Sequence, residues 1–157
     1  MKKELVNNRL ELVRPEGFRV MDHEELKQAY GIDYDCMWGM RDEERHIILS
    51  VFWKVSNKLI SKLGTAKLVA DESQKAMRRR YRKAGYYSNG LFETEVAGNK
   101  AWGFSYGYTP DGPAQSCETV VVKDGTCCYT VLYHTREECA QANRALYEEV
   151  LASATLR

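Results

Sequence analysis

This sequence lacks two features that would assign a protein to a class at once: a dominant charge and a long apolar run. Twenty-three Lys and Arg residues are balanced by 22 Asp and Glu residues, which leaves a formal net charge of +1. Such a chain has no global field that attracts nucleic acid or an anionic membrane. No stretch approaches the roughly 18 apolar residues of a transmembrane helix. We therefore expect neither nucleic acid nor a membrane as a partner.

The N-terminus also lacks the apolar core of a secretory signal peptide. Residues 1–8, Met-Lys-Lys-Glu-Leu-Val-Asn-Asn, are polar and lead directly into a strand-like segment. This absence predicts a cytoplasmic protein.

The cysteines lack the pattern of a metal site or a disulfide framework. Their number is odd and none shows C-x-x-C spacing; they are Cys36, Cys117, Cys127, Cys128 and Cys139. His23 and His46 have no histidine or cysteine at metal-ligand spacing. We expect reduced thiols, no metal site and no cofactor.

What is present fits an ordinary folded protein. The chain has 157 residues, of which 44% are hydrophobic and 29% charged, and both fractions are average for globular proteins. The length suits one hydrophobic core and is short for two. A single domain over residues 1–157 is the expectation.

Hydrophobic periodicity and turn residues predict mixed secondary structure. In chain order we expect a strand over 9–13, a helix over 22–30, a hairpin of strands 37–41 and 46–53, a helical stretch over 56–84, strands over 86–96, 101–108, 116–122 and 126–134, and a final helix from 135 or 136 to 152. Asp22 and Glu25 form a capping box at the first helix, and Gly31 suits its left-handed end. Gly64 can divide the helical stretch in two.

These elements predict an α+β fold. The last four strands follow one another with tight turns between them, which favours antiparallel pairing. The helices are then expected to flank an antiparallel sheet of about six or seven strands. Both an α/β/α sandwich and a two-layer form fit this order. The apolar stripe of the final helix is expected to include Cys139, Ala142, Leu146 and Val150.

Three segments carry a resemblance to a known family. They are the stretch Glu95 to Tyr108, a hairpin over residues 120–133 and a final helix that ends in Leu151-Ala152-Ser153. With the element order, they resemble the PsbP/Mog-like family over most of the chain, and its small bacterial members of unassigned function most of all. The resemblance implies an α/β/α sandwich and protein binding in preference to catalysis. No functional residue of the family matches well enough to be carried over.

An aromatic stripe alternates with small residues in one predicted strand. Trp102, Phe104, Tyr106 and Tyr108 share one face of this strand, and Ala101, Gly103, Ser105 and Gly107 share the other. One interpretation is a ligand pocket, to which the neighbouring Tyr86 and Tyr87 also contribute. The other is a core strand whose small face admits a closely packed helix.

A run of basic residues closes the long helical stretch. On a helix, Arg78, Arg79, Arg82 and Lys83 share a face while Tyr81 points away. This basic ridge can grip phosphate or an acidic protein surface. It can also be a solvated face whose cations favour the C-terminal end of the helix dipole.

Catalytic constellations are absent from the sequence. Adjacent Cys127 and Cys128 point to opposite faces of a strand, and Cys128 is about 20 Å from His134 along that strand. Solvation explains the turn carboxylates Asp42, Glu43 and Glu44. Without a phosphate loop or nucleophile elbow, no catalytic residue is assigned and we expect no enzyme.

The sequence therefore predicts a non-enzymatic protein-binding or adaptor domain. A small-molecule binding protein, with its pocket around Trp102 to Tyr108, is the alternative. A homo-oligomer through a sheet edge is compatible with either.

Overall fold

The computed structural model describes residues 1–59 and 64–157. A seven-stranded antiparallel sheet dominates it, and in spatial order its strands are β3 (Arg19–Val20), β4 (Met37–Asp42), β5 (Ile47–Val55), β9 (Cys127–Arg136), β8 (Gln115–Asp124), β7 (Asn99–Tyr108) and β6 (Tyr87–Val96). A second sheet pairs β1 (Lys2–Val6), β2 (Leu10–Arg14) and β10 (Thr155–Leu156). The large sheet confirms the predicted α+β fold and its strand number.

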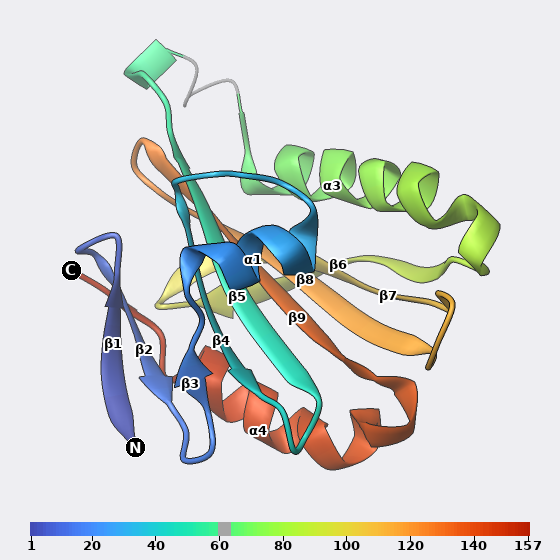
Figure 1. Cartoon of the computed structure of the whole chain (residues 1–157). Coiled ribbons are helices and arrows are strands. Elements are labelled where there is room, and N and C mark those ends of the chain that lie inside the picture. Colours follow the sequence, from blue (N-terminus) through green and yellow to red (C-terminus); the bar gives the residue numbers. More distant parts are fainter. Residues whose placement is uncertain (60–63) are drawn as a thin grey trace.

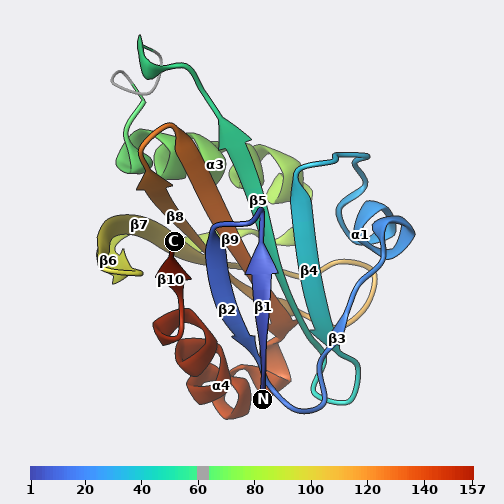
Figure 2. The same cartoon turned by 90° about the vertical axis from the view of Figure 1, so that its left-hand side faces the viewer.

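Helices and the small sheet cover the two faces of the large sheet (Figure 1). Helices α1 (His23–Tyr30) and α3 (Ala66–Tyr81) lie on one face. Helix α4 (Ala140–Ala152) and the small sheet lie on the other, which Figure 2 shows from the side of β1 and β2. The architecture is an α/β/α sandwich with an added sheet in one outer layer.

Each face of the large sheet has its own buried core. Beneath α4 and the small sheet, Leu10 and Leu12 of β2 pack with Val120 and Tyr129, and all four side chains are buried. Beneath α3, Phe104, Tyr106 and Cys117 form a separate buried cluster. A third cluster, centred on Leu26 and Tyr30, lies beneath α1.

Both ends of α1 are set by the capping residues in its sequence. The side chain of Asp22 accepts a hydrogen bond from the backbone N–H of Glu25 (2.9 Å), and Glu25 accepts one from that of Asp22 (3.4 Å). Gly31 ends the helix at a φ of 69°, a conformation that glycine adopts without a steric penalty. The capping box and the cap predicted from the sequence are both confirmed.

Several local predictions differ from the structure. β1, β3 and β10 were not expected, and the final helix, predicted from residue 135 or 136, begins as α4 only at Ala140 because β9 continues to Arg136. α3 begins at Ala66, after its N-cap Thr65, which agrees with the predicted break at Gly64. The part of the predicted helical stretch on residues 60–63 lies outside the described residues. In the final helix Ala142 is exposed.

The buried face of α4 is more polar than the predicted stripe. It consists of Asn143, Tyr147 and Val150. Asn143 donates hydrogen bonds to Thr135 Oγ1 and to a backbone carbonyl, both at 2.9 Å, and Tyr147 stacks on Tyr133 with ring centroids 4.1 Å apart. A polar side chain is readily buried when it finds such partners. Within the described ranges, no helix is long and apolar enough to cross a membrane.

Candidate functional site

The basic ridge predicted from the sequence lies at the C-terminal end of α3. Arg78 and Arg79 belong to its last turn, and Arg82 and Lys83 to the 3-10 turn that follows (Arg82–Ala84). All four side chains are exposed, while Tyr81 turns toward the sheet and stacks on Tyr108 with ring centroids 3.7 Å apart. The predicted division of this segment into a basic face and an inward tyrosine agrees with this arrangement.

Arg80 differs from its neighbours because it ties α3 to α1. Its Nη2 donates a hydrogen bond to the backbone carbonyl of Tyr30 (3.2 Å), and its guanidinium lies 5.4 Å from the ring centroid of Tyr81. Arg80 therefore has a structural role at the junction of the two helices and is not part of the ridge.

The ridge is set apart by its lack of carboxylate partners. Within residues 1–59 and 64–157, none of its four cations forms an ion pair. Every arginine outside residues 78–82 does form one, and the pairs are Arg9–Asp124, Arg14–Glu4, Arg19–Glu25, Arg41–Glu43, Arg45–Asp42, Arg136–Glu138, Arg144–Glu118 and Arg157–Glu11. The unpaired guanidinium charge of the protein is thus concentrated at one end of α3.

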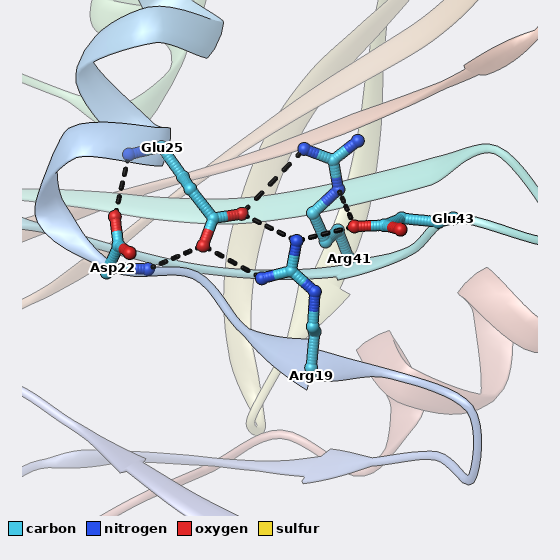
Figure 3. Close-up of polar contacts among 5 residues, drawn as sticks. All are labelled: Arg19, Asp22, Glu25, Arg41 and Glu43. Carbon is cyan, nitrogen blue, oxygen red and sulfur yellow. Dashed lines mark hydrogen bonds and ion pairs between the residues drawn. The ribbon is translucent and has the colours of Figure 1, made fainter.

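The edge of the large sheet shows how completely other arginines are neutralised (Figure 3). Arg19 of β3 bridges Glu25 of α1 (2.8 Å) and Glu43 of the β4–β5 turn (2.5 Å). Arg41 of β4 approaches the same two carboxylates at 3.9 and 3.7 Å. Hydrogen bonds from Arg19 lower the pKa of both carboxyls. This network joins α1 to the sheet and pairs both arginines with carboxylates, Arg19 through hydrogen bonds and Arg41 at longer range.

The aromatic stripe of β7 lies under α3. Phe104 is fully buried and Tyr106 is 2% exposed, and Met77 and Tyr81 of α3 pack against them. Tyr86 joins the cluster, with its ring centroid 5.8 Å from that of Tyr106. A ligand among these side chains has to displace α3. Ligand binding at the stripe stays a prediction, and this packing argues against it.

Trp102 and Tyr108 are half-buried at the two ends of the stripe. The ammonium of Lys67 lies 4.7 Å from the ring centroid of Trp102, a distance typical of a cation–π contact. Each end of the stripe therefore has a partner from α3, since Tyr108 stacks on Tyr81.

Tyr87 does not belong to the group in which the sequence placed it. It pairs with Gly107 across β6 and β7, on the face opposite to Tyr106, and its ring occupies the space where a Cβ of Gly107 would lie. Phe92 covers Gly103 in the same way. The glycines of β7 therefore admit rings from the neighbouring strand, and the helix expected on the small face is not in contact with them.

Sequence reasoning missed the closest thiol–imidazole pair. Cys117 of β8 and His134 of β9 are register partners, and Sγ lies 3.2 Å from Nδ1. Burial raises the pKa of Cys117 to about 12, and burial together with the charge of Arg80 lowers that of His134 to about 4. Both groups are neutral near pH 7, so the thiolate that a cysteine nucleophile requires is absent. Strand register is the signal that could have paired them.

Asp42 and His23 both have charged neighbours that the sequence did not predict. Asp42 was assigned to solvent but is 2% exposed, because Arg45 supplies it with a backbone N–H and a guanidinium. The structure also gathers His23, Asp33 and Asp35, whose ligand atoms lie within 4.8 Å of one another. All three are exposed, and His23 Nε2 already lies 2.6 Å from Asp33. We propose no metal there.

Comparison with known proteins identifies the fold. No protein-family model and no curated protein matches the chain. Among solved structures it is similar to cyanobacterial PsbP (CyanoP) from Synechocystis sp. PCC 6803, with a TM-score of 0.71 and 19% identity over 99% of this chain and 92% of that one. It is also similar to the Ran-binding protein Mog1p of Saccharomyces cerevisiae, with a TM-score of 0.60 and 11% identity over 99% and 94%.

A third similar structure is LpqN, a protein involved in cell envelope biogenesis of Mycobacterium tuberculosis. It shares 13% identity with this chain, at a TM-score of 0.53, over 94% of this chain and 82% of that one. The chain therefore has the PsbP/Mog-like fold that its sequence predicted. At these identities the likeness defines the fold and leaves the function to be argued from the site.

Proposed function

We propose that this protein is a non-enzymatic protein-binding or adaptor domain, and that it contacts an acidic protein surface through the basic ridge of Arg78, Arg79, Arg82 and Lys83. One observation carries the proposal: in the part of the chain that the structure describes, these arginines have no carboxylate partner, whereas every arginine outside residues 78–82 has one. A partner protein with surface carboxylates would give the ridge arginines the kind of ion pair that the other arginines form within the chain.

The chemistry of guanidinium favours a protein surface as the partner. Arginine forms bidentate, charge-assisted hydrogen bonds with carboxylates and loses less hydration than lysine when it does so. The ridge side chains are exposed on the outside of a helix end, an arrangement that suits a broad surface better than a small ligand. Small ligands are more often held in concave sites.

Two further observations support the class of function. The name of Mog1p records that one protein of this fold binds another protein, Ran. The neutral state of Cys117 and His134 near pH 7 removes the most reactive pair that we find among the described residues. Both agree with a binding role without catalysis.

The test is capture of protein partners by the tagged chain at low and moderate salt. We expect a partner that is lost as salt rises, because exposed ion pairs weaken once the Debye length shortens to about 8 Å. The double reversal Arg79→Glu and Arg82→Glu should abolish this capture, while Lys2→Glu with Lys100→Glu, which makes the same change in net charge, should not. Equal capture by both double variants would refute the ridge as the contact surface.

Self-association and location are further parts of this proposal. A homo-oligomer through a sheet edge, a dimer at its smallest, stays a prediction. One of the edges is β6, which has a register shift between Ser88 and Leu91 and exposed Glu93 and Glu95. Bulges and charges of this kind oppose edge pairing. Light scattering at increasing concentration tests the dimer, and fractionation of cells tests the predicted cytoplasmic location.

A further inference from the structure

A pocket of ≈ 310 Å³ is lined by residues from the end of β5 and from both sides of the β8–β9 turn. Figure 1 shows this end of the large sheet, where β5 leaves it and the β8–β9 hairpin turns. The pocket lies on the face that α3 covers, and its described lining includes no residue of the basic ridge or of the aromatic stripe of β7. Its lining comes from several segments of the chain and includes Tyr34, Phe52, Lys54, Val69, Lys123 and Cys128.

The walls of this pocket are largely apolar. The ring of Phe52 stacks against that of Tyr34, with centroids 6.2 Å apart and planes at 16°. Val69 in the first turns of α3 lines it as well. The hydroxyl of Tyr34 donates a hydrogen bond to the backbone carbonyl of Trp53 (3.2 Å), which fixes the aromatic wall. An apolar cavity of this size lies within the range of small-molecule sites.

Two lysines flank a cysteine at the floor of the pocket. Lys54 of β5 and Lys123 of β8 are both register partners of Cys128 on the central strand β9, so the three side chains lie on one face of the sheet. Lys123 Nζ donates a hydrogen bond to the carbonyl of Gly64 (2.6 Å), which holds the ammonium at the pocket wall.

The positive charges of Lys54 and Lys123 act on the thiol of Cys128 in the pocket. Burial raises the pKa of Cys128, and the positive charges of Lys123 and Lys54 partly offset this rise. Among the described residues the lining has these two cations and no carboxylate, and Lys54 forms no ion pair there. A ligand that complements such a pocket has an apolar body and one anionic group.

We propose that this pocket binds a small amphipathic carboxylate, with the apolar chain or ring against Tyr34, Phe52 and Val69 and the carboxylate between Lys54 and Lys123. The apolar chain contributes affinity because its methylenes are removed from water. The carboxylate gives orientation, because charge-assisted hydrogen bonds are short and directional. The site is independent of the ridge and of the proposed protein partner.

The first experiment titrates the full chain with sodium decanoate by calorimetry. Decan-1-ol, which is neutral, and decyltrimethylammonium, which is a cation, carry a similar alkyl chain and are titrated in parallel. We expect saturable binding of decanoate, weaker binding of the alcohol and none of the cation. Lys54→Gln and Lys123→Gln should each weaken decanoate binding roughly tenfold, whereas Lys100→Gln, on the distant β6–β7 hairpin, should leave it unchanged.

The second experiment uses the pocket thiol as a reporter of position. Alkylation is followed by mass spectrometry at Cys128 and at Cys139, which is also partly exposed but precedes α4. Decanoate should slow alkylation of Cys128 and leave that of Cys139 unchanged. Equal binding of acid and alcohol, unaffected by the lysine variants, would overturn the anion site. Unprotected Cys128 beside saturable binding would show that the ligand binds elsewhere.

Discussion

The thiol of Cys117 and the imidazole of His134 face each other at 3.2 Å across β8 and β9. Their surroundings are aromatic, since the rings of Tyr30 and Tyr106 lie edge-on to the imidazole at centroid distances of 5.8 and 6.4 Å. The pair resembles a catalytic dyad in composition, but burial keeps both groups neutral near pH 7. It is therefore a packed, hydrogen-bonding part of the core, and two predictions follow from its neutrality.

Acid should destabilise the protein through His134. Its pKa is about 4 in the folded chain against 6.5 as the reference, so the unfolded chain binds the proton more tightly. Its contribution is complete above pH 6.5 and falls as the pH drops toward about 4, by up to about 3 kcal/mol. Urea unfolding of the wild type and of His134→Phe across this range measures the difference. Identical acid slopes for the two proteins would show that His134 does not cause it.

Cys117 should be among the slowest thiols to react in the native protein. Burial raises its pKa to about 12, so only about one molecule in ten thousand carries the thiolate at about pH 8. Cys36 and Cys139 are partly exposed and should be alkylated first. Labelling followed by mass spectrometry gives the order, and labelling in concentrated guanidinium should remove it. Early modification of Cys117 in the native state would contradict its burial.

Gly103→Ala and Gly107→Ala should differ in cost. A Cβ at Gly103 would lie 2.7 Å from the backbone carbonyl of Thr119 and 2.8 Å from the ring of Phe92, and backbone cannot move aside cheaply. At Gly107 the three nearest atoms all belong to the side chain of Tyr87, which is 49% exposed and can swing outward. We expect a loss of about 2–3 kcal/mol for Gly103→Ala and less for Gly107→Ala. Chemical denaturation of both variants decides the order.

Asp42→Asn should destabilise the β4–β5 turn. Asp42 accepts a hydrogen bond from the backbone N–H of Arg45 (3.0 Å) and pairs with its guanidinium. Burial raises the pKa of Asp42, but the bonds from Arg45 outweigh it and the net pKa is lowered. The ionised form therefore stabilises the fold above about pH 4, and this is lost in acid.

The control for this variant is Glu44→Gln in the same turn. Glu44 is exposed, so its neutralisation should change the free energy of unfolding by no more than about 0.5 kcal/mol. Asp42→Asn should cost about 2 kcal/mol at neutral pH. Equal effects at the two positions would show that the turn does not depend on the buried carboxylate.

Local signals predicted most of the large sheet. The hairpin arms of β4 and β5 and the four strands β6 to β9 lie within a few residues of their predicted ranges, because alternation and turn residues are local properties. The small sheet was missed because β10 pairs with β2, which is far away in sequence. The Asn7-Asn8 pair, with φ angles of 51° and 56°, is a turn signal that could have indicated β1.

The candidate sites were also predicted only where the signal in the sequence is local. Helical spacing predicted that the ridge side chains point outward at the end of the helical stretch, which agrees with their exposure in α3 and the 3-10 turn after it. It could not show that the ridge arginines lack carboxylate partners among the described residues. The pairing of Cys117 with His134, and of Lys54 and Lys123 with Cys128, depends on strand register. Within the β8–β9 hairpin the register is fixed by the tight turn after Asp124, so this turn could have paired Cys117 with His134. The pairing of Lys54 with Cys128 joins β5 to β9, which are far apart in sequence, and no local turn fixes it.

The separation between paired and unpaired arginines has a kinetic consequence. With a net charge of +1 and with the arginines outside residues 78–82 paired at short range among the described residues, the protein offers an incoming partner a positive pole of uncompensated guanidinium charge at the end of α3. Such a pole orients an acidic molecule during its approach, before side chains touch, and increases the rate of productive encounters. Salt should therefore slow association far more than it speeds dissociation.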